Sequence, residues 1–194
     1  MLVRLDRQQH REHESQHHVN GCDVSRSPRR LLSSRACRSD STSGLVEWTD
    51  GDSFRVRLAE GRLETFRLYF IDTSESRSRG TRSDEQAAYF GLTRAQAIEL
   101  GSQAKVFTAR ALAQPFTIYT RWRKVFGPTR YYAIVVTAAG HDLNELLVSN
   151  GLARIYGTRT PLPDGRDSRT YLGHLHELET EARAAKRRAW GKAH

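Results

Sequence analysis

Two aspartates lie at corresponding ends of two β-patterned segments. Asp52 directly precedes the first segment and Asp72 ends the second, and each is in phase with the alternating apolar side chains of its segment. A hairpin through residues 59–61 that sets Phe54 opposite Phe70 places Asp52 opposite Asp72, one cross-strand pair further on. The spacing therefore predicts two carboxylates in close contact.

Such a pair of carboxylates needs positive charge between its members. Two like charges in contact repel, so either one carboxylate takes up a proton or a hard cation lies between the two. Oxygen-only ligands at a strand edge suit calcium or magnesium. A third carboxylate, Glu75, and a guanidinium, Arg67, stand beside the pair in the sequence. The group therefore predicts either a shared proton or an oxygen-ligated metal ion.

The composition fits one domain with a basic extension. The chain has 194 residues, of which 38% are hydrophobic and 27% charged, and its formal net charge is +9. Most of the positive charge is arginine, whose planar fork matches phosphate oxygens two at a time. A polyanionic partner such as nucleic acid explains this charge, and solubility alone is the competing explanation.

Residues 1–43 differ from the rest of the chain. They are rich in Arg, His, Ser and Gln and have almost no periodic apolar pattern, so we expect a disordered basic leader ahead of one folded domain at 44–191. No segment approaches the ~18 consecutive apolar residues of a membrane span, and no membrane insertion is expected. The first residues show no apolar core of a secretory signal, yet an exported and an internal location are both compatible with the sequence.

The pattern of the folded part indicates an α+β fold. Apolar alternation predicts strands at 45–48, 53–58, 65–72, 116–122 and 131–136. Helical spacing and capping residues predict helices at 84–90, 93–100, 102–113, 143–150 and 167–190. Five strands with one helical excursion suit a five-stranded OB-fold β-barrel capped by helices better than a β-α-β sheet.

Five blocks in this order, between about Leu45 and Trp190, resemble the staphylococcal nuclease (thermonuclease) family. They are Asp50-Gly51-Asp52-Ser53, the run from Thr65 through Ile71-Asp72-Thr73-Ser74-Glu75, Arg130 at the start of a strand, the run 143–153, and Ala189-Trp190. A single block would be a weak signal, since Asp-Gly-Asp occurs in many turns, but the ordered set is specific.

The resemblance implies an OB barrel that hydrolyses phosphodiester bonds in DNA and RNA with one calcium ion. It implies a monomeric endonuclease with little sequence preference, acting on single-stranded or denatured nucleic acid and leaving 5′-hydroxyl and 3′-phosphate ends. The calcium ligands that the resemblance implies are Asp52, Asp72 and the backbone carbonyl of Thr73. The catalytic side chains that it implies are Arg67, Glu75 and Arg130. Glu75 would hold or deprotonate the attacking water, and the arginines would grip the phosphate.

Several of these residues also have a structural explanation. Asp50 more simply shapes its turn. Glu75 lies in a basic loop and could pair with its arginine neighbours, Arg77 and Arg79. Arg67 alternates onto the face opposite its apolar neighbours, so its role rests on the resemblance. Three other basic residues near Arg130 are alternative candidates for its role in gripping the phosphate: Arg121, Arg123 and Lys124.

The chain also departs from the family pattern. Serine replaces threonine at Ser53 and proline at Ser74, and Thr129 stands where glycine usually precedes the arginine. Residues 82–97 look like an inserted helical pair beside the active-site loop. The tyrosine segment that stacks on bases in the family is only loosely echoed by Tyr156.

Two functions of another class compete with catalysis. One is a catalytically silent OB-fold module that binds nucleic acid or protein; such modules usually lose an acidic residue, and none is lost here. The other is a plain single-strand-binding protein, which would expose aromatic residues of its strands. The candidates for that role are Tyr69, Tyr119, Trp122 and Tyr131.

Overall fold

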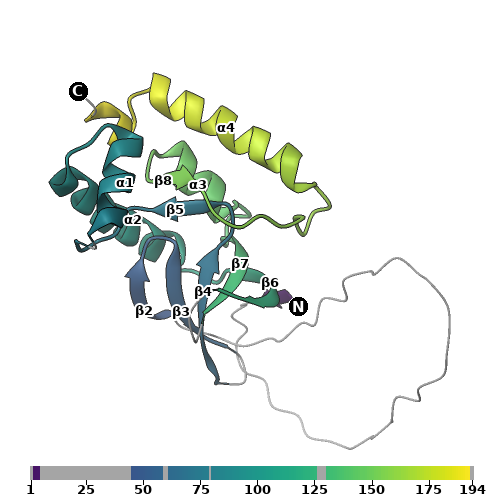
Figure 1. The fold of residues 1–194 in the computed structure, drawn as a ribbon. Coiled ribbons are helices and arrows are strands. Elements are labelled where there is room, and N and C mark those ends of the chain that lie inside the picture. The colour runs from purple at the N-terminus through teal and green to yellow at the C-terminus, as the bar shows by residue number, and fades with distance from the viewer. Residues whose placement is uncertain (1, 5–44, 59–60, 79, 126–129, 193–194) are drawn as a thin grey trace, which may run out of the picture.

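The chain forms an α+β fold, as its sequence predicts, with helices gathered over one end of a β-sheet (Figure 1). The structure is a computed structural model and describes residues 2–4, 45–58, 61–78, 80–125 and 130–192. The strands are β1 (Leu2–Arg4), β2 (Leu45–Asp50), β3 (Ser53–Arg57), β4 (Leu63–Leu68), β5 (Ile71–Thr73), β6 (Thr117–Lys124), β7 (Arg130–Val136) and β8 (Ala153–Ile155). The helices are α1 (Thr81–Phe90), α2 (Arg94–Ala111), α3 (Leu143–Ser149), α4 (Ser168–Ala184) and a 3-10 turn, η1 (Arg188–Gly191).

The strands form one mixed sheet and one short two-stranded sheet. The larger sheet has the order β1-β6-β7-β4-β3-β2, in which β4 and β7 run parallel and the other neighbours antiparallel. The five strands expected from the sequence correspond to β2, β3, β4, β6 and β7. Within the described residues no hydrogen-bonded pair joins β2 to β6, so the sheet is not closed into the expected barrel.

A short strand of the basic leader pairs with the sheet. β1 lies antiparallel to β6, with Val3 opposite Ile118. The remainder of the leader lies outside the described residues, so its expected disorder stays a prediction. The family departure at Thr129 also lies outside them.

The register of the β3–β4 hairpin differs from the expected one. Phe54 lies opposite Phe66, not Phe70. Phe70 has a φ of 65°, which L residues with bulky side chains rarely adopt, and this turn ends β4 and redirects the chain. The backbone N–H and carbonyl of Phe70 are both bonded to residues 156–158, which hold the turn. Asp72 therefore lies on β5, paired with β8, and not on the strand that faces β3.

Three helices differ from their expected bounds. The helix expected at 84–90 begins earlier, at Thr81. The separate helices expected at 93–100 and 102–113 form the single helix α2, which begins at a capping box between Thr93 and Gln96. The helix expected at 167–190 ends at Ala184, because the chain beyond it turns through positive φ angles at Lys186 and Arg188.

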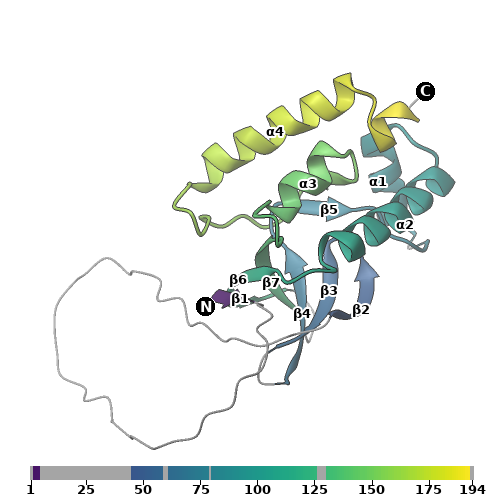
Figure 2. The ribbon, with the colours of Figure 1, turned by 180° about the vertical axis from the view of Figure 1, so that it is seen from behind.

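The main core lies between the sheet and the helices. β5, α3 and α4 follow one another as layers above the sheet in both views (Figures 1 and 2). The largest fully buried side chains among the described residues come from all these layers: Phe54, Leu58, Phe66, Leu68, Phe70, Ile71, Phe90, Ile118, Leu143, Leu147, Leu152 and Tyr171. In the part of the chain that the structure describes, no helix is both long and apolar enough to cross a bilayer.

The N-cap of α3 is a buried carboxylate. Asp142 accepts a hydrogen bond of 2.7 Å from the backbone N–H of Asn144, so the cap expected from the sequence is confirmed. Burial outweighs this hydrogen bond and raises the pKa of Asp142 to about 6.

Asp142→Asn is expected to flatten the pH dependence of stability. Since the pKa of Asp142 rises from 3.8 in the unfolded chain to about 6 on folding, folding takes up a proton between these values. Stability is therefore lost as pH rises through about 6, by roughly 1–3 kcal/mol. Asparagine keeps the cap without a charge. Urea unfolding between pH 4.5 and 7.5 measures the free energy of unfolding of the wild type and of Asp142→Asn. The same pH dependence in both proteins would contradict the prediction.

The N-cap of α4, Asp167, provides a control, because its pKa shifts in the opposite direction to that of Asp142. Hydrogen bonds from Thr170 lower the pKa of the exposed Asp167 carboxylate, so its stabilisation is present above the unfolded pKa and lost as pH falls. Asp167→Asn should therefore change the pH dependence of the free energy of unfolding in the acid range only.

Candidate active site

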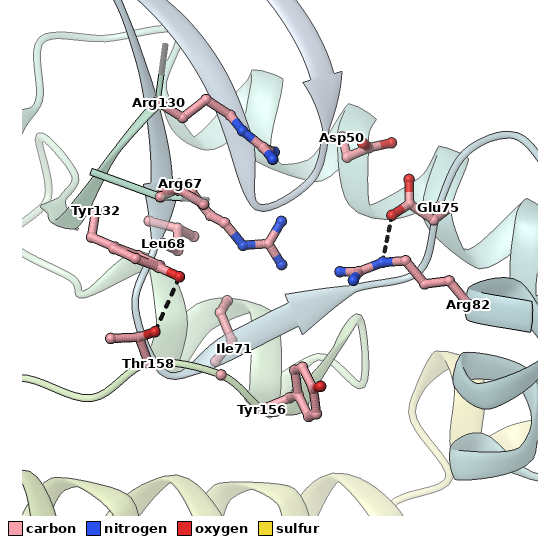
Figure 3. A pocket seen from close by; sticks show the side chains of 12 residues that line it. Asp50, Arg67, Leu68, Ile71, Glu75, Arg82, Arg130, Tyr132, Tyr156 and Thr158 are labelled. Carbon is pink, nitrogen blue, oxygen red and sulfur yellow. Dashed lines mark hydrogen bonds and ion pairs between the residues drawn. The ribbon is translucent and has the colours of Figure 1, made fainter. Parts of the chain in front are cut away.

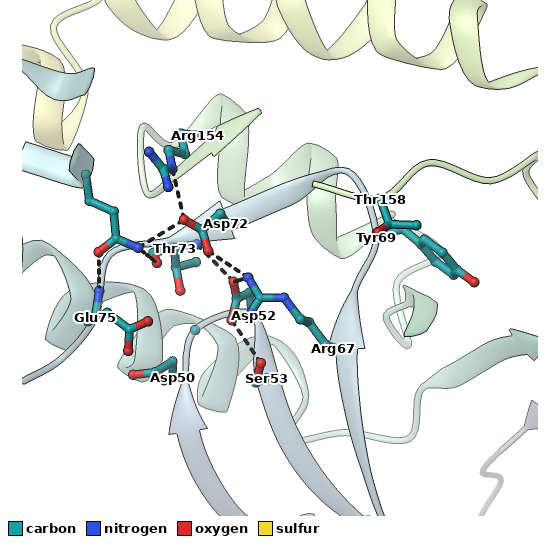
Figure 4. Close-up of polar contacts among 12 residues, drawn as sticks. Asp50, Asp52, Ser53, Arg67, Tyr69, Asp72, Thr73, Glu75, Arg154 and Thr158 are labelled. Atoms are coloured by element: carbon teal, nitrogen blue, oxygen red, sulfur yellow. Dashed lines mark hydrogen bonds and ion pairs between the residues drawn. The ribbon is translucent and has the colours of Figure 1, made fainter. Parts of the chain in front are cut away.

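The two aspartates singled out by the sequence meet at one guanidinium group. Nη2 of Arg67 lies 3.0 Å from Oδ2 of Asp52 and 2.7 Å from Oδ1 of Asp72 (Figure 4). Arg67 is opposite Ser53 in the β3–β4 register, which brings it beside Asp52. The carboxylates are close together, as expected, but through the β4–β5 turn and not through a common hairpin.

Asp72 is the most enclosed group of the site. Its side chain is 0% exposed. Oδ1 accepts from Arg67 and from Nη2 of Arg82 on α1, at 2.7 and 2.5 Å. Oδ2 accepts from Nε of Arg154 at 2.9 Å and Nε2 of Gln86 at 3.0 Å. Arg154 is the residue directly opposite Asp72 in the β5–β8 pair. One carboxylate therefore joins β4, β5, β8 and α1.

The two buried aspartates have different pKa values. Burial alone would raise both. At Asp72 the hydrogen bond from Gln86 and the charges of three arginines outweigh burial, so the pKa of this carboxyl is lowered. At Asp52 burial outweighs the charge of Arg67, and the nearby charge of Asp72 adds to it, so the pKa of Asp52 rises to about 6. Asp72 is thus the more readily ionised member of the pair.

Thr73 and Glu75 follow Asp72 along the same edge. The backbone N–H of Thr73 donates to Oδ2 of Asp52 at 3.1 Å, and the Thr73 carbonyl accepts from Nε2 of Gln86 at 2.9 Å. The N–H of Glu75 donates to Oε1 of Gln86 at 2.9 Å, and Oε1 of Glu75 lies 2.7 Å from Nε of Arg82. Glu75 therefore pairs with an arginine of α1.

Asp50 has the structural role that its turn sequence suggests. Its Oδ1 accepts from the backbone N–H and the hydroxyl of Ser76, at 3.3 and 3.1 Å. The turn before β3 is thereby tied to the loop that carries Glu75.

The ion-paired residues border an open cleft of about 580 Å³ (Figure 3). Arg67, Arg82, Arg130 and Glu75 line it, together with two tyrosines, Tyr132 and Tyr156. Arg130 is opposite Thr65 in the parallel β4–β7 pair and so lies near Arg67. The three alternative candidates, Arg121, Arg123 and Lys124, are not among the described residues that line the cleft.

Tyr156 stands at the rim of this cleft. Its side chain is 53% exposed, and its ring lies 4.4 Å from the guanidinium carbon of Arg154. The contact between a cation and an aromatic face holds the ring in place. An exposed aromatic ring beside arginines is suited to an unstacked base.

Sequence reasoning missed three residues that complete the site: Arg82, Gln86 and Arg154. Arg82 and Gln86 are four residues apart and share one face of α1, a spacing that is visible in the sequence. Arg154 interrupts the apolar run at 152–155, which marks it as a charged residue in a buried strand. Neither signal identifies Asp72 as the common partner.

Helix α2 approaches the site through two glycines. A Cβ atom on Gly101 would lie 2.4 Å from the carbonyl oxygen of Ser74 and 2.6 Å from that of Glu75. A Cβ atom on Gly51 would lie 2.7 Å from that of Ala104. The glycines therefore let α2 pack directly against the backbone that carries the carboxylates.

The fold and the cleft define an α+β protein that presents clustered arginines and carboxylates at one edge of a mixed sheet. The family model described as staphylococcal nuclease homologue matches residues 65–192, and the chain belongs to this family. Comparison with curated proteins gave no match. The family indicates a nuclease-type function with nucleic acid as substrate. Asp52 lies ahead of the matched residues.

Gly101→Ala is expected to destabilise the protein even though alanine favours helices. The added methyl group would overlap the Ser74 and Glu75 carbonyls, and such overpacking costs about 1–3 kcal/mol. Gly173→Ala in α4 is the matched control, because a Cβ there meets nothing within 4 Å and should stabilise by about 0.5–1 kcal/mol. Urea unfolding measures the change in the free energy of unfolding for both variants. Equal changes would contradict the close approach of Gly101 to the Ser74 and Glu75 carbonyls.

Arg154→Met is expected to lower the free energy of unfolding by about 3 kcal/mol, since it leaves the buried Asp72 carboxylate with fewer partners. In an Asp72→Asn background the same change should cost much less, because no buried charge remains. Equal losses in both backgrounds, measured by chemical denaturation, would mean that Arg154 acts by packing alone.

Proposed function

We propose that the protein is a calcium-dependent nuclease that hydrolyses phosphodiester bonds in DNA and RNA with little sequence preference, leaving 5′-hydroxyl and 3′-phosphate ends. One observation carries the proposal: Asp52 and Asp72 converge on Arg67 at the edge of a cleft that Glu75 and Arg130 also line. Membership of the nuclease family supports it.

The oxygen atoms that would hold calcium are gathered at one place. Nη2 of Arg67 reaches both aspartates, and Nε2 of Gln86 reaches both Asp72 and the Thr73 carbonyl. Two carboxylates and a carbonyl are donors that calcium prefers. The described residues contain no cluster of three or more Asp, Glu, His or Cys side chains able to hold a metal, so waters and substrate would complete the shell. The donor set fits calcium, with Asp52, Asp72 and Thr73 as its ligands.

The catalytic roles follow from charge and position. Glu75 accepts a proton from the attacking water, whose oxygen bonds to phosphorus while the bond from phosphorus to the 5′ oxygen breaks. The leaving 5′ oxygen takes up a proton from solvent. Arg67 and Arg130 donate to the phosphoryl oxygens, where negative charge grows. Bound calcium would supply further positive charge at those oxygens.

The cleft lining accounts for broad specificity. Its cationic groups are arginines, which recognise phosphate, a feature common to every nucleotide. Tyr132 and Tyr156 offer aromatic surface to bases of any kind, which favours single-stranded or denatured substrate.

We also infer that the sheet is a partly open barrel of the OB type, formed by one domain at about 44–191 that acts as a monomer. The sequential β2-β3-β4 meander, the parallel β4–β7 pair and the β6–β7 hairpin support this topology.

A silent binding module is the second candidate. It is favoured by the saturation of Asp72 with donors from four side chains, as in a structural ion-pair network. Such a module would bind nucleic acid through the same arginines without cleaving it.

Release of acid-soluble nucleotides from denatured DNA tests the proposal. Cleavage should require millimolar calcium, stop with chelator, and fall about 10²–10⁴-fold in Glu75→Gln and Arg130→Ala. Arg121→Ala is the matched control, since it removes the same charge from an exposed site outside the cleft and should leave most activity. Salt-sensitive DNA binding without cleavage would favour the binding module instead.

A further inference from the structure

Helix α1 reaches into the proposed calcium site from the side. Arg82 and Gln86 lie one helical turn apart, and both contact the segment from Asp72 to Glu75. Gln86 satisfies the Thr73 carbonyl and the Glu75 N–H, while Arg82 bridges the carboxylates of Asp72 and Glu75. The helix therefore contacts two of the three proposed calcium ligands, Asp72 and the Thr73 carbonyl.

Within the ion-paired cluster the charges balance before any ligand arrives. Three carboxylates, those of Asp52, Asp72 and Glu75, are matched by three guanidinium groups, those of Arg67, Arg82 and Arg154. Adding a doubly charged cation to a neutral, largely buried cluster is unfavourable. With one arginine displaced, the cluster has the net negative charge that attracts calcium.

Arg82 is the arginine best placed to leave. Its side chain is 38% exposed, against 15% for Arg67 and 7% for Arg154. Arg154 is fixed opposite Asp72 in the β5–β8 pair. Arg82 extends from the first turn of α1 into the cleft, where its side chain is drawn beside Glu75 (Figure 3).

We propose that Arg82 is a resident counter-ion that occupies Asp72, one of the proposed calcium ligands, when calcium is absent, and that calcium binds only by displacing it. This inference rests on the proposed calcium-dependent function. Arg82 lines the cleft in which the proposed substrate would bind. Competition with Arg82 therefore sets a threshold calcium concentration below which the site does not bind calcium.

Calcium titration by isothermal calorimetry, without nucleic acid, tests the inference. Arg82→Ala should bind calcium about tenfold more tightly than the wild type, a change of about 1.4 kcal/mol. Arg82→Lys keeps a charge but loses the fork that bridges two carboxylates, so its affinity should lie between the two. Arg94→Ala is the matched control, because Arg94 forms an exposed ion pair with Asp84 of α1 and should leave calcium binding unchanged.

The outcomes separate this inference from the proposed function. Equal or weaker calcium binding by folded Arg82→Ala, with wild-type binding and cleavage intact, overturns the counter-ion role alone. If neither protein binds calcium, the calcium-dependent function fails and the inference with it. Should Arg82→Ala not fold by circular dichroism, Arg82→Lys decides: affinity at or below that of the wild type overturns the counter-ion role, and tighter binding supports it.

Discussion

The fold depends most on one buried negative charge, the carboxylate of Asp72. A fully buried carboxylate is tolerated only when donors satisfy it, because its desolvation costs several kcal/mol. Its donors come from three elements, β4, α1 and β8, and the donor on β8 is 82 positions away in the sequence. Displacement of any of these elements removes at least one donor from the buried charge, so their relative positions are held by electrostatics as well as by packing.

Backbone geometry supplies the second constraint. The positive φ of Phe70 turns the chain between β4 and β5 and brings Asp72 beside Asp52. Gly101 then allows α2 to lie against the carbonyls of the following loop. The conformational strain at Phe70 is offset by complete burial of its ring and by hydrogen bonds on both sides of its backbone. The carboxylates are thus positioned by a rigid frame.

Local pattern and long-range contact explain what the sequence could and could not predict. Alternation located five strands of the main sheet, all but β1, and capping residues such as Asp142 located helix starts, because both signals are local. The turn at Phe70 has no local signal, since phenylalanine is an unusual residue at positive φ. The pairing of Asp72 with Arg154 joins residues 82 positions apart, and Arg82 becomes a neighbour only once α1 has folded back.

The enclosure of Asp72 also separates two ways in which this site can change over evolutionary time. Glu75 lies nearer the cleft surface than Asp72, with an 11% exposed side chain and contacts at the edge of the charge cluster. A lineage can therefore lose the proposed base at Glu75 while retaining the scaffold. Loss of Asp72 would instead leave Arg67 and Arg154 without their shared anion, so drift toward a non-hydrolytic descendant is more accessible through Glu75 than through Asp72.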